Sequence, residues 1–228
     1  MTCAATIPTV FLVDDDPAVL HTLSRLLRLA GYQVSAFASS QEFLVGHDRA
    51  VPGCLVLELI MPGLNGLELH NALTASGPQR PTIFISGHAD VSSSVQAMKT
   101  GAVDFLTKPV SKDYLLGAIR RAVEKDRQMR EAGDELRAIG TRLATLTRRE
   151  LEVFHQVVAG RLNKQIAWDL GIGVKTIKVH RGRVMEKMGV HSLADLVRMA
   201  DRIRAGQASA QAARPTDHPY LATENSLE

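Results

Sequence analysis

The sequence predicts an α/β domain of alternating strands and helices, followed by a long helix and a small all-α domain. Within residues 1–122, five short apolar runs alternate with segments whose apolar residues recur at helical spacing. From residue 123 to residue 205 this alternation stops and only helical signals are present. Strands that alternate with helices form a parallel sheet covered on both faces, so we expect a flavodoxin-like (βα)5 order for the first domain.

Each strand of the first domain is expected where a short apolar run ends in polar or turn residues, at 9–13, 33–37, 55–59, 82–86 and 103–107. The helices are expected roughly at 18–30, 41–45, 66–75, 91–100 and from 112 onward. The first helix has the clearest pattern, because Val19, Leu23 and Leu27 share one face and Gly31 follows its end.

A linker at 123–145 is expected to continue the last of these helices, because the segment has no proline and is rich in Ala, Arg, Glu and Leu. Apolar residues recur there at the a and d positions of about three heptads, at Met129, Ala132, Leu136, Ile139, Leu143 and Leu146. Such a seam suits a dimerising coiled coil. It equally suits a single amphipathic helix packed on its own domain, and Gly133 and Gly140 weaken the helix.

The second domain, 146–205, is expected to be all helical. Thr147 and Glu150 have the spacing of a capping box, and Asn163 is expected to cap a helix at 164–170. A turn then leads to a helix at 175–188, and a last helix follows Ser192. Residues 206–228 have no hydrophobic period and are predicted to form a disordered tail.

The charge balance differs between the two parts of the chain. Residues 1–113 hold 7 Lys and Arg against 10 Asp and Glu, whereas residues 114–228 hold 20 against 14, which favours a polyanionic partner for the second part. No membrane is expected, since no apolar stretch approaches the ~18–20 residues of a membrane span and the N-terminus lacks a signal-peptide pattern. Cys3 and Cys54 are not expected to pair, so the composition fits a cytoplasmic protein.

Polar residues follow the apolar runs of the first domain where the carboxyl ends of parallel strands meet. Asp14 and Asp15 follow the first run, Glu58 ends the third, and Ser86 and Lys108 follow the fourth and fifth. Clustered carboxylates suit Mg²⁺, which prefers oxygen ligands. A structural alternative for the acidic triplet is a helix start, and Asp16 before Pro17 is expected to be that cap.

These residues resemble the phosphoacceptor pocket of a bacterial response-regulator receiver domain. The segments Ser86-Gly-His-Ala-Asp90 and Lys99-Thr-Gly-Ala-Val-Asp-Phe-Leu-Thr-Lys-Pro109 are similar to the FixJ-type subgroup of receivers. The resemblance implies that a sensor histidine kinase is a partner and that Lys108 and Ser86 contact a phosphate, while Phe105 is the aromatic switch residue. It further implies Mg²⁺ as the cofactor, held by Asp14, Asp15, Glu58 and the backbone carbonyl of Ile60.

Glu58 departs from this family, because the matching residue in receivers is the aspartate that accepts phosphate. The carboxyl of glutamate lies one C–C bond further from the backbone, and a misplacement of ~1 Å can slow positioned chemistry on the order of 100-fold. Three explanations stay open, namely a regulator that works without phosphorylation, a substitution made to imitate phosphate, and a weak acceptor.

The second domain carries a helix–turn–helix pattern between Leu162 and Met188. Ile177, Val184 and Met188 mark one apolar face of the last helix, while the other face is basic and includes an exposed valine, which suits a DNA major groove. The segment resembles a LuxR-type DNA-binding domain. The resemblance implies contacts to bases by Lys178, Val179 and Gly182 and contacts to the DNA backbone by Lys164, Lys175, Thr176 and Arg183.

Together the two resemblances imply a FixJ-type transcription regulator of a phosphorelay, which binds double-stranded promoter DNA as a homodimer and works with RNA polymerase. The receiver would control dimerisation, and no enzymatic activity is expected. One alternative is a protein-interaction scaffold built on a degenerate receiver. A less favoured alternative is an Mg²⁺-dependent phosphatase, because Asp14 and Asp16 form an Asp-x-Asp pattern but Ala18 is unusual for that class.

Overall fold

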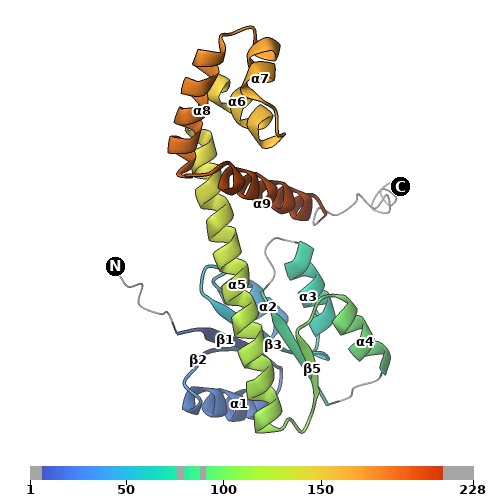
Figure 1. Cartoon of the computed structure of the whole chain (residues 1–228). Coiled ribbons are helices and arrows are strands. Elements are labelled where there is room, and N and C mark those ends of the chain that lie inside the picture. Colours follow the sequence, from blue (N-terminus) through green and yellow to red (C-terminus); the bar gives the residue numbers. More distant parts are fainter. Residues whose placement is uncertain (1–6, 76–79, 88–90, 213–228) are drawn as a thin grey trace, which may run out of the picture. The chain divides into compact units, whose positions relative to one another are not determined.

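The computed structural model describes residues 7–75, 80–87 and 91–212 (Figure 1), and the chain divides into two compact units, Met1–Arg130 and Glu131–Glu228. Cys3 and residues 213–228 lie outside the described residues, and residues 206–212, predicted to begin a disordered tail, instead continue the last helix. Among the helices that the structure describes, none is long and apolar enough to cross a membrane.

The first unit contains a parallel sheet of five strands in the order β2-β1-β3-β4-β5, which confirms the predicted flavodoxin-like topology. The strands are β1 (Thr9–Val13), β2 (Gln33–Phe37), β3 (Gly53–Glu58), β4 (Thr82–Ser86) and β5 (Asp104–Thr107). The helices between and after them are α1 (Pro17–Leu29), α2 (Ser40–Gly46), α3 (Gly66–Ala75), α4 (Val91–Lys99) and α5 (Lys112–Ala144). As expected, Asp16 caps α1, because its Oδ1 accepts the backbone N–H of Ala18 at 2.8 Å.

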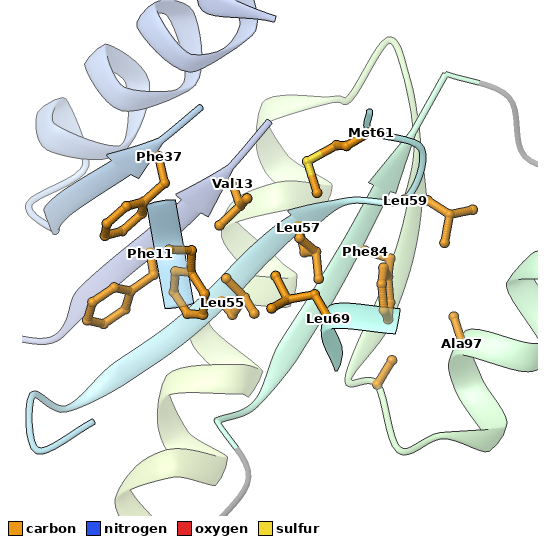
Figure 2. Packing of buried hydrophobic residues seen from close by; sticks show 12 residues of the cluster. Phe11, Val13, Phe37, Leu55, Leu57, Leu59, Met61, Leu69, Phe84 and Ala97 are labelled. Carbon is orange, nitrogen blue, oxygen red and sulfur yellow. The ribbon is translucent and has the colours of Figure 1, made fainter. Parts of the chain in front are cut away.

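Side chains alternate between the two faces of this sheet, so each face has its own apolar core. Figure 2 shows one face, where strand residues pack with Leu69 of α3 and Ala97 of α4. Phe43 of α2 belongs to the same cluster. On the other face, Leu27 of α1 and Ile119 of α5 pack against the intervening strand residues Val10, Leu12, Cys54, Val56, Ile83 and Ile85. Because the central strands are buried on both faces, they read as continuous apolar runs in the sequence.

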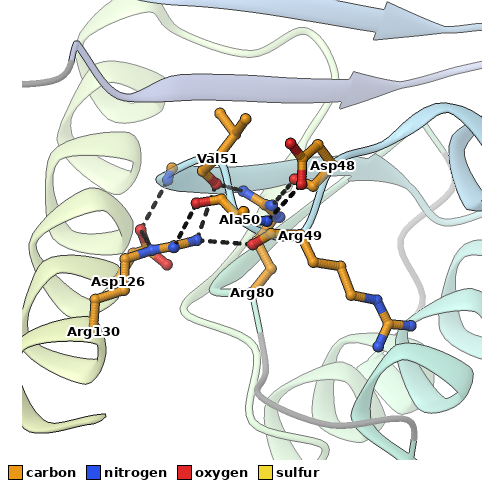
Figure 3. Close-up of polar contacts among 8 residues, drawn as sticks. Asp48, Arg49, Ala50, Val51, Arg80, Asp126 and Arg130 are labelled. Atoms are coloured by element: carbon orange, nitrogen blue, oxygen red, sulfur yellow. Dashed lines mark hydrogen bonds and ion pairs between the residues drawn. The ribbon is translucent and has the colours of Figure 1, made fainter. Parts of the chain in front are cut away.

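The helix α5 is tied to the amino-terminal edge of the sheet by a buried carboxylate (Figure 3). Asp126, which is 5% exposed, accepts the backbone N–H of Gly53 and the Nε of Arg130, both at 2.8 Å. Arg130 also donates to the carbonyl oxygens of Arg49, Ala50 and Val51 at 3.2, 2.8 and 2.9 Å. These bonds fix α5 to the β2–β3 connection as far as Arg130.

Gly53 is required where this connection enters β3. Its φ of +145° is in the region that favours glycine, and a Cβ there would lie 1.8 Å from the carbonyl oxygen of Thr9. Arg80, two residues before β4, supports the same connection, since it donates to the carbonyls of Asp48 and Val51 and lies over the Phe11 ring at 4.0 Å.

The second unit is helical in its described part and contains α6 (Arg148–Val158), α7 (Asn163–Leu170), α8 (Val174–Met188) and α9 (Leu193–Ala212). The predicted capping box at α6 is confirmed, because Thr147 and Glu150 each accept the other's backbone N–H. The expectation that Asn163 caps α7 is wrong. Leu162 is the N-cap, and the Asn163 side chain instead accepts Arg181 at 3.2 Å, so a contact distant in sequence replaces the local cap.

The carboxyl-terminal part of α5 belongs to the core of this second unit. Ile139 is 3% exposed there, and the partly buried Leu143 and Leu146 pack against the same cluster of α6, α7, α8 and α9 residues. The apolar seam at these positions is therefore covered within the chain, which favours the packed amphipathic helix over the coiled coil for this segment.

Candidate functional site

The polar residues predicted at the strand ends gather at the carboxyl edge of the sheet. Asp14 directly follows β1, Glu58 ends β3, Ser86 ends β4 and Lys108 follows β5. Parallel pairing of β3 with β1 and β4, and of β4 with β5, brings these ends together.

Lys108 connects the two buried acids of this edge. Its Nζ lies 2.7 Å from Oδ2 of Asp14 and 2.6 Å from Oε2 of Glu58, whose side chains are 3% and 6% exposed. Burial lowers the pKa of the Lys108 ammonium, but its hydrogen bonds and charge interactions with Asp14 and Glu58 outweigh burial and raise the pKa above its usual value. The ammonium therefore stays charged between the two carboxylates.

The remaining oxygens of both carboxylates accept backbone N–H groups. Oε1 of Glu58 accepts the amides of Leu59 and Ile60 at 2.9 and 3.1 Å, and Oδ1 of Asp14 accepts the amide of Asp16 at 2.9 Å. All four carboxylate oxygens of Asp14 and Glu58 are thus engaged by the protein, and the glutamate is held in one position.

A magnesium ion in this pocket would share its carboxylates with Lys108. Asp15 and Ile60 are exposed, and no group of three or more His, Cys, Asp or Glu in the described part of the chain is placed to hold a metal. A cation at Asp14 and Glu58 would face the Lys108 ammonium, which already neutralises part of their charge.

Ser86 and Phe105, the other two pocket residues implied by the sequence, lie on the neighbouring strands β4 and β5. Ser86 is fully buried, and its carbonyl accepts the backbone N–H of Lys108 at 2.8 Å. Phe105 is half-buried and stacks with Phe84 at a centroid distance of 6.5 Å. The peptide bond between Lys108 and Pro109 is cis.

The residues predicted to bind DNA are exposed on α7 and α8. Ile177, Val184 and Met188 of α8 are fully buried in the core of the second unit, as their spacing predicted. The opposite face of α8 presents to solvent Lys175, Thr176, Lys178, Val179, Gly182 and Arg183. Lys164 is exposed on α7, and the bond from Arg181 to Asn163 joins the two helices.

One supporting ion pair was not predicted from the sequence. Lys187 of α8 donates to Oε2 of the buried Glu150 at 2.7 Å and to the carbonyl of Thr145 at 3.0 Å. The hydrogen bond from Lys187, together with the capping amide of Thr147, lowers the pKa of Glu150 to about 2. The capping-box spacing gave a signal for Glu150, but no local pattern links it to a lysine 37 positions away.

Comparison with known proteins agrees with this geometry. Residues 10–120 match the response regulator receiver domain, and residues 144–200 match the luxR family of bacterial regulatory proteins. Response regulator protein TodT of Pseudomonas putida is 43% identical over 195 residues, which cover 86% of each chain. Transcriptional regulatory protein FixJ of Azorhizobium caulinodans is 41% identical over 210 residues, which cover 91% of this chain and 97% of FixJ.

The solved structure of response regulator StyR is also similar, with a TM-score of 0.77 and 41% identity over 86% of this chain and 99% of that one. The two matches, the sheet order and the exposed basic face of α8 agree with one another. The chain belongs to the family of response regulators that join a receiver domain to a LuxR-type DNA-binding domain and regulate transcription.

Proposed function

We propose that this response regulator adopts its DNA-binding state without phosphorylation, because Glu58 supplies the negative charge that a phosphorylated aspartate supplies in its relatives. The salt bridge of 2.6 Å between Glu58 and Lys108 carries this proposal. In receivers the matching lysine pairs with the acyl phosphate, and here a carboxylate already occupies that partner's place.

The same contacts oppose phosphoryl transfer to Glu58. One of its oxygens is held by two backbone amides and the other by Lys108, so neither is free to attack in line. Positioned reactions of this type lose on the order of 100-fold for a displacement of ~1 Å. A sensor histidine kinase is therefore not expected to regulate this protein by phosphorylating Glu58.

Receiver domains in general bind Mg²⁺ at this acidic pocket. In this chain, binding by Asp14, Asp15, Glu58 and the Ile60 carbonyl stays a prediction that requires displacement of Lys108. The expected consequence is weak binding, since the ammonium and the metal would compete for the same carboxylates.

The exposed face of α8, together with Lys164 of α7, then contacts promoter DNA, with Lys178, Val179 and Gly182 at the bases and Lys164, Lys175, Thr176 and Arg183 at the backbone. Each DNA-binding unit is small, so pairing of two chains raises the effective concentration of the second unit at a second half-site. We propose that the receivers bring the chains together, that RNA polymerase is the downstream partner, and that the protein works in the cytoplasm.

The experiment compares the protein with Glu58→Asp and Glu58→Gln at one salt concentration. Duplexes are first selected from a random library by the protein itself, and affinities are then measured with and without acetyl phosphate and Mg²⁺. We expect tight binding by the protein regardless of phosphodonor, weak binding by Glu58→Gln, and binding by Glu58→Asp that depends on phosphodonor.

Comparison of the protein with Glu58→Gln separates the effect of the charge at position 58 from the effect of side-chain size, because Gln keeps the length of Glu but cannot neutralise Lys108. If the protein binds weakly and only Glu58→Asp responds to acetyl phosphate, Glu58 is a disabled acceptor and the proposal is wrong. If the Gln variant binds as tightly as the protein, the charge of Glu58 is irrelevant to DNA binding.

A further inference from the structure

The first unit has a groove of about 500 Å³ between α1 and the start of α5, two helices that lie side by side in Figure 1. The residues that line it come from α1, its C-cap Ala30 and the first two turns of α5. Pockets that bind small molecules have volumes of roughly 300–1,000 Å³. The groove therefore has the size of a small-molecule site.

The walls of the groove offer apolar surface from both helices. Leu26 of α1 and Leu116 of α5 line the groove and are partly buried against the core between these helices and the sheet. Leu29, the last residue of α1, also lines it and is 81% exposed. Covering apolar surface contributes about 25 cal/mol per Å², so these three leucines favour a ligand with an apolar body.

The same groove carries positive charge that its own walls do not balance. Arg25 of α1 and Lys112 of α5 line it together with His21, and no Asp or Glu is among the lining residues. Asp113 follows Lys112 in the sequence but does not line the groove. Within the residues that the structure describes, neither Arg25 nor Lys112 forms an ion pair. The groove therefore favours an anionic group beside the apolar body.

The charged and apolar parts of the groove lie toward different ends. Both helices begin at the carboxyl edge of the sheet, because α1 follows β1 and α5 follows β5. Lys112 is the first residue of α5 and lies toward that edge, whereas Leu29 ends α1 and lies toward the opposite edge. A ligand with one anionic head and an apolar body thus fits the groove in a single orientation.

We propose that this groove binds a small amphipathic carboxylate, with its head between Arg25 and Lys112 and its apolar body along Leu26, Leu29 and Leu116. Two cations suit a single carboxylate, which a guanidinium can bind through two N–H groups. Duplex DNA is instead bound by many basic residues that follow its phosphates. The ligand joins α1 to α5 and gives the receiver a chemical input other than phosphorylation.

The test titrates the full chain with octanoate. Isothermal titration calorimetry gives the affinity, and NMR of the methyl groups of Leu26, Leu29 and Leu116 locates the ligand. Acetate has the carboxylate without the apolar body, and octanol has the apolar body without the charge. We expect a dissociation constant on the order of 0.1–1 mM for octanoate and binding at least about tenfold weaker for acetate and octanol.

Three variants test the role of charge in the groove. Arg25→Gln and Lys112→Gln each remove one positive charge and should weaken octanoate binding about fivefold, as expected for one exposed ion pair. Arg28→Gln is the matched control, because Arg28 is an exposed arginine of the same helix that does not line the groove. Its affinity for octanoate should equal that of the unmodified protein.

Four outcomes would overturn the inference. Octanol that binds as tightly as octanoate would show that the charge is irrelevant, and acetate that binds as tightly would show an ion held by surface cations alone. Equal losses in Arg25→Gln and Arg28→Gln would show attraction to the whole surface of α1. Octanoate that leaves the methyl signals of the three leucines unchanged, whether it binds elsewhere or not at all, would exclude the groove.

Discussion

Replacement of Asp126 by alanine should destabilise the receiver unit by about 2–3 kcal/mol. The variant leaves the buried N–H of Gly53 without its acceptor, which costs ~1–3 kcal/mol. The lost ion pair with Arg130 adds less than about 1 kcal/mol, because the Arg130 side chain is 33% exposed and keeps its bonds to three backbone carbonyls. No change of fold is expected, since the apolar cores on both faces of the sheet are untouched.

The measurement is urea unfolding followed by far-UV circular dichroism, together with hydrogen exchange of peptides that contain β3 and residues 120–130. Asp126→Ala should lower the midpoint and speed exchange at Gly53, while the peptides of α7 and α8 exchange as in the unmodified protein. Asp126→Asn is the matched control, because its amide oxygen can still accept the Gly53 N–H and should recover about half of the loss. A loss below ~0.5 kcal/mol for Asp126→Ala would refute the reasoning that this carboxylate anchors α5.

Three further predictions concern the second unit. Val179→Glu should abolish the preference for a selected duplex over random DNA, whereas Lys164→Ala should weaken both equally and reduce the salt dependence, and equal losses in both variants would contradict the assigned roles. The pKa of Glu150 is lowered from 4.5 to about 2 in the folded state. The ionised Glu150 therefore stabilises the folded state fully above pH 4.5, and this stabilisation is lost as the pH falls toward 2. Glu150→Gln keeps a capping-box side chain but loses the charge. The difference in melting temperature between the protein and this variant should therefore shrink as the pH falls from 4.5 toward 2. A difference that stays constant with pH would contradict the ion pair with Lys187. Gly133→Ala should stabilise α5 by about 0.5–1 kcal/mol, because a Cβ at residue 133 meets no atom within 4 Å. Slower hydrogen exchange around residue 133 would show this stabilisation. Unchanged exchange would indicate that this turn of the helix is already rigid.

The sheet and the residues at its carboxyl edge could be predicted from the sequence, because both follow from local patterns. The strand ends that carry Asp14, Glu58 and Lys108 could be located from apolar runs, and parallel pairing brings such ends together. The capping of α1 by Asp16 and the inward face of α8 were predictable for the same reason, since each depends on spacing within one helix.

What the sequence could not provide are contacts whose partners are far apart along the chain. Asp126 and Arg130 form hydrogen bonds to the backbone N–H of Gly53 and to backbone carbonyls. Such backbone groups are common to all residues, so no sequence pattern predicts these contacts. The Lys187–Glu150 pair joins two helices. The heptad pattern at Ile139 is the same in the sequence whether a second chain or the helices of its own unit cover that residue. Asn163 was misassigned as a cap because a local rule competed with a distant donor, Arg181.

The position of Lys108 explains why a glutamate, and not a neutral residue, is compatible with this pocket. Asp14 and Lys108 are both held at the sheet edge by features that do not depend on residue 58, namely the amide of Asp16 and the backbone bond from Lys108 to Ser86. A neutral side chain at position 58 would leave the ammonium with Asp14 alone and the amides of Leu59 and Ile60 without their carboxylate acceptor. The glutamate reaches all three donors at once, so its carboxylate holds the Lys108 ammonium and accepts both backbone amides.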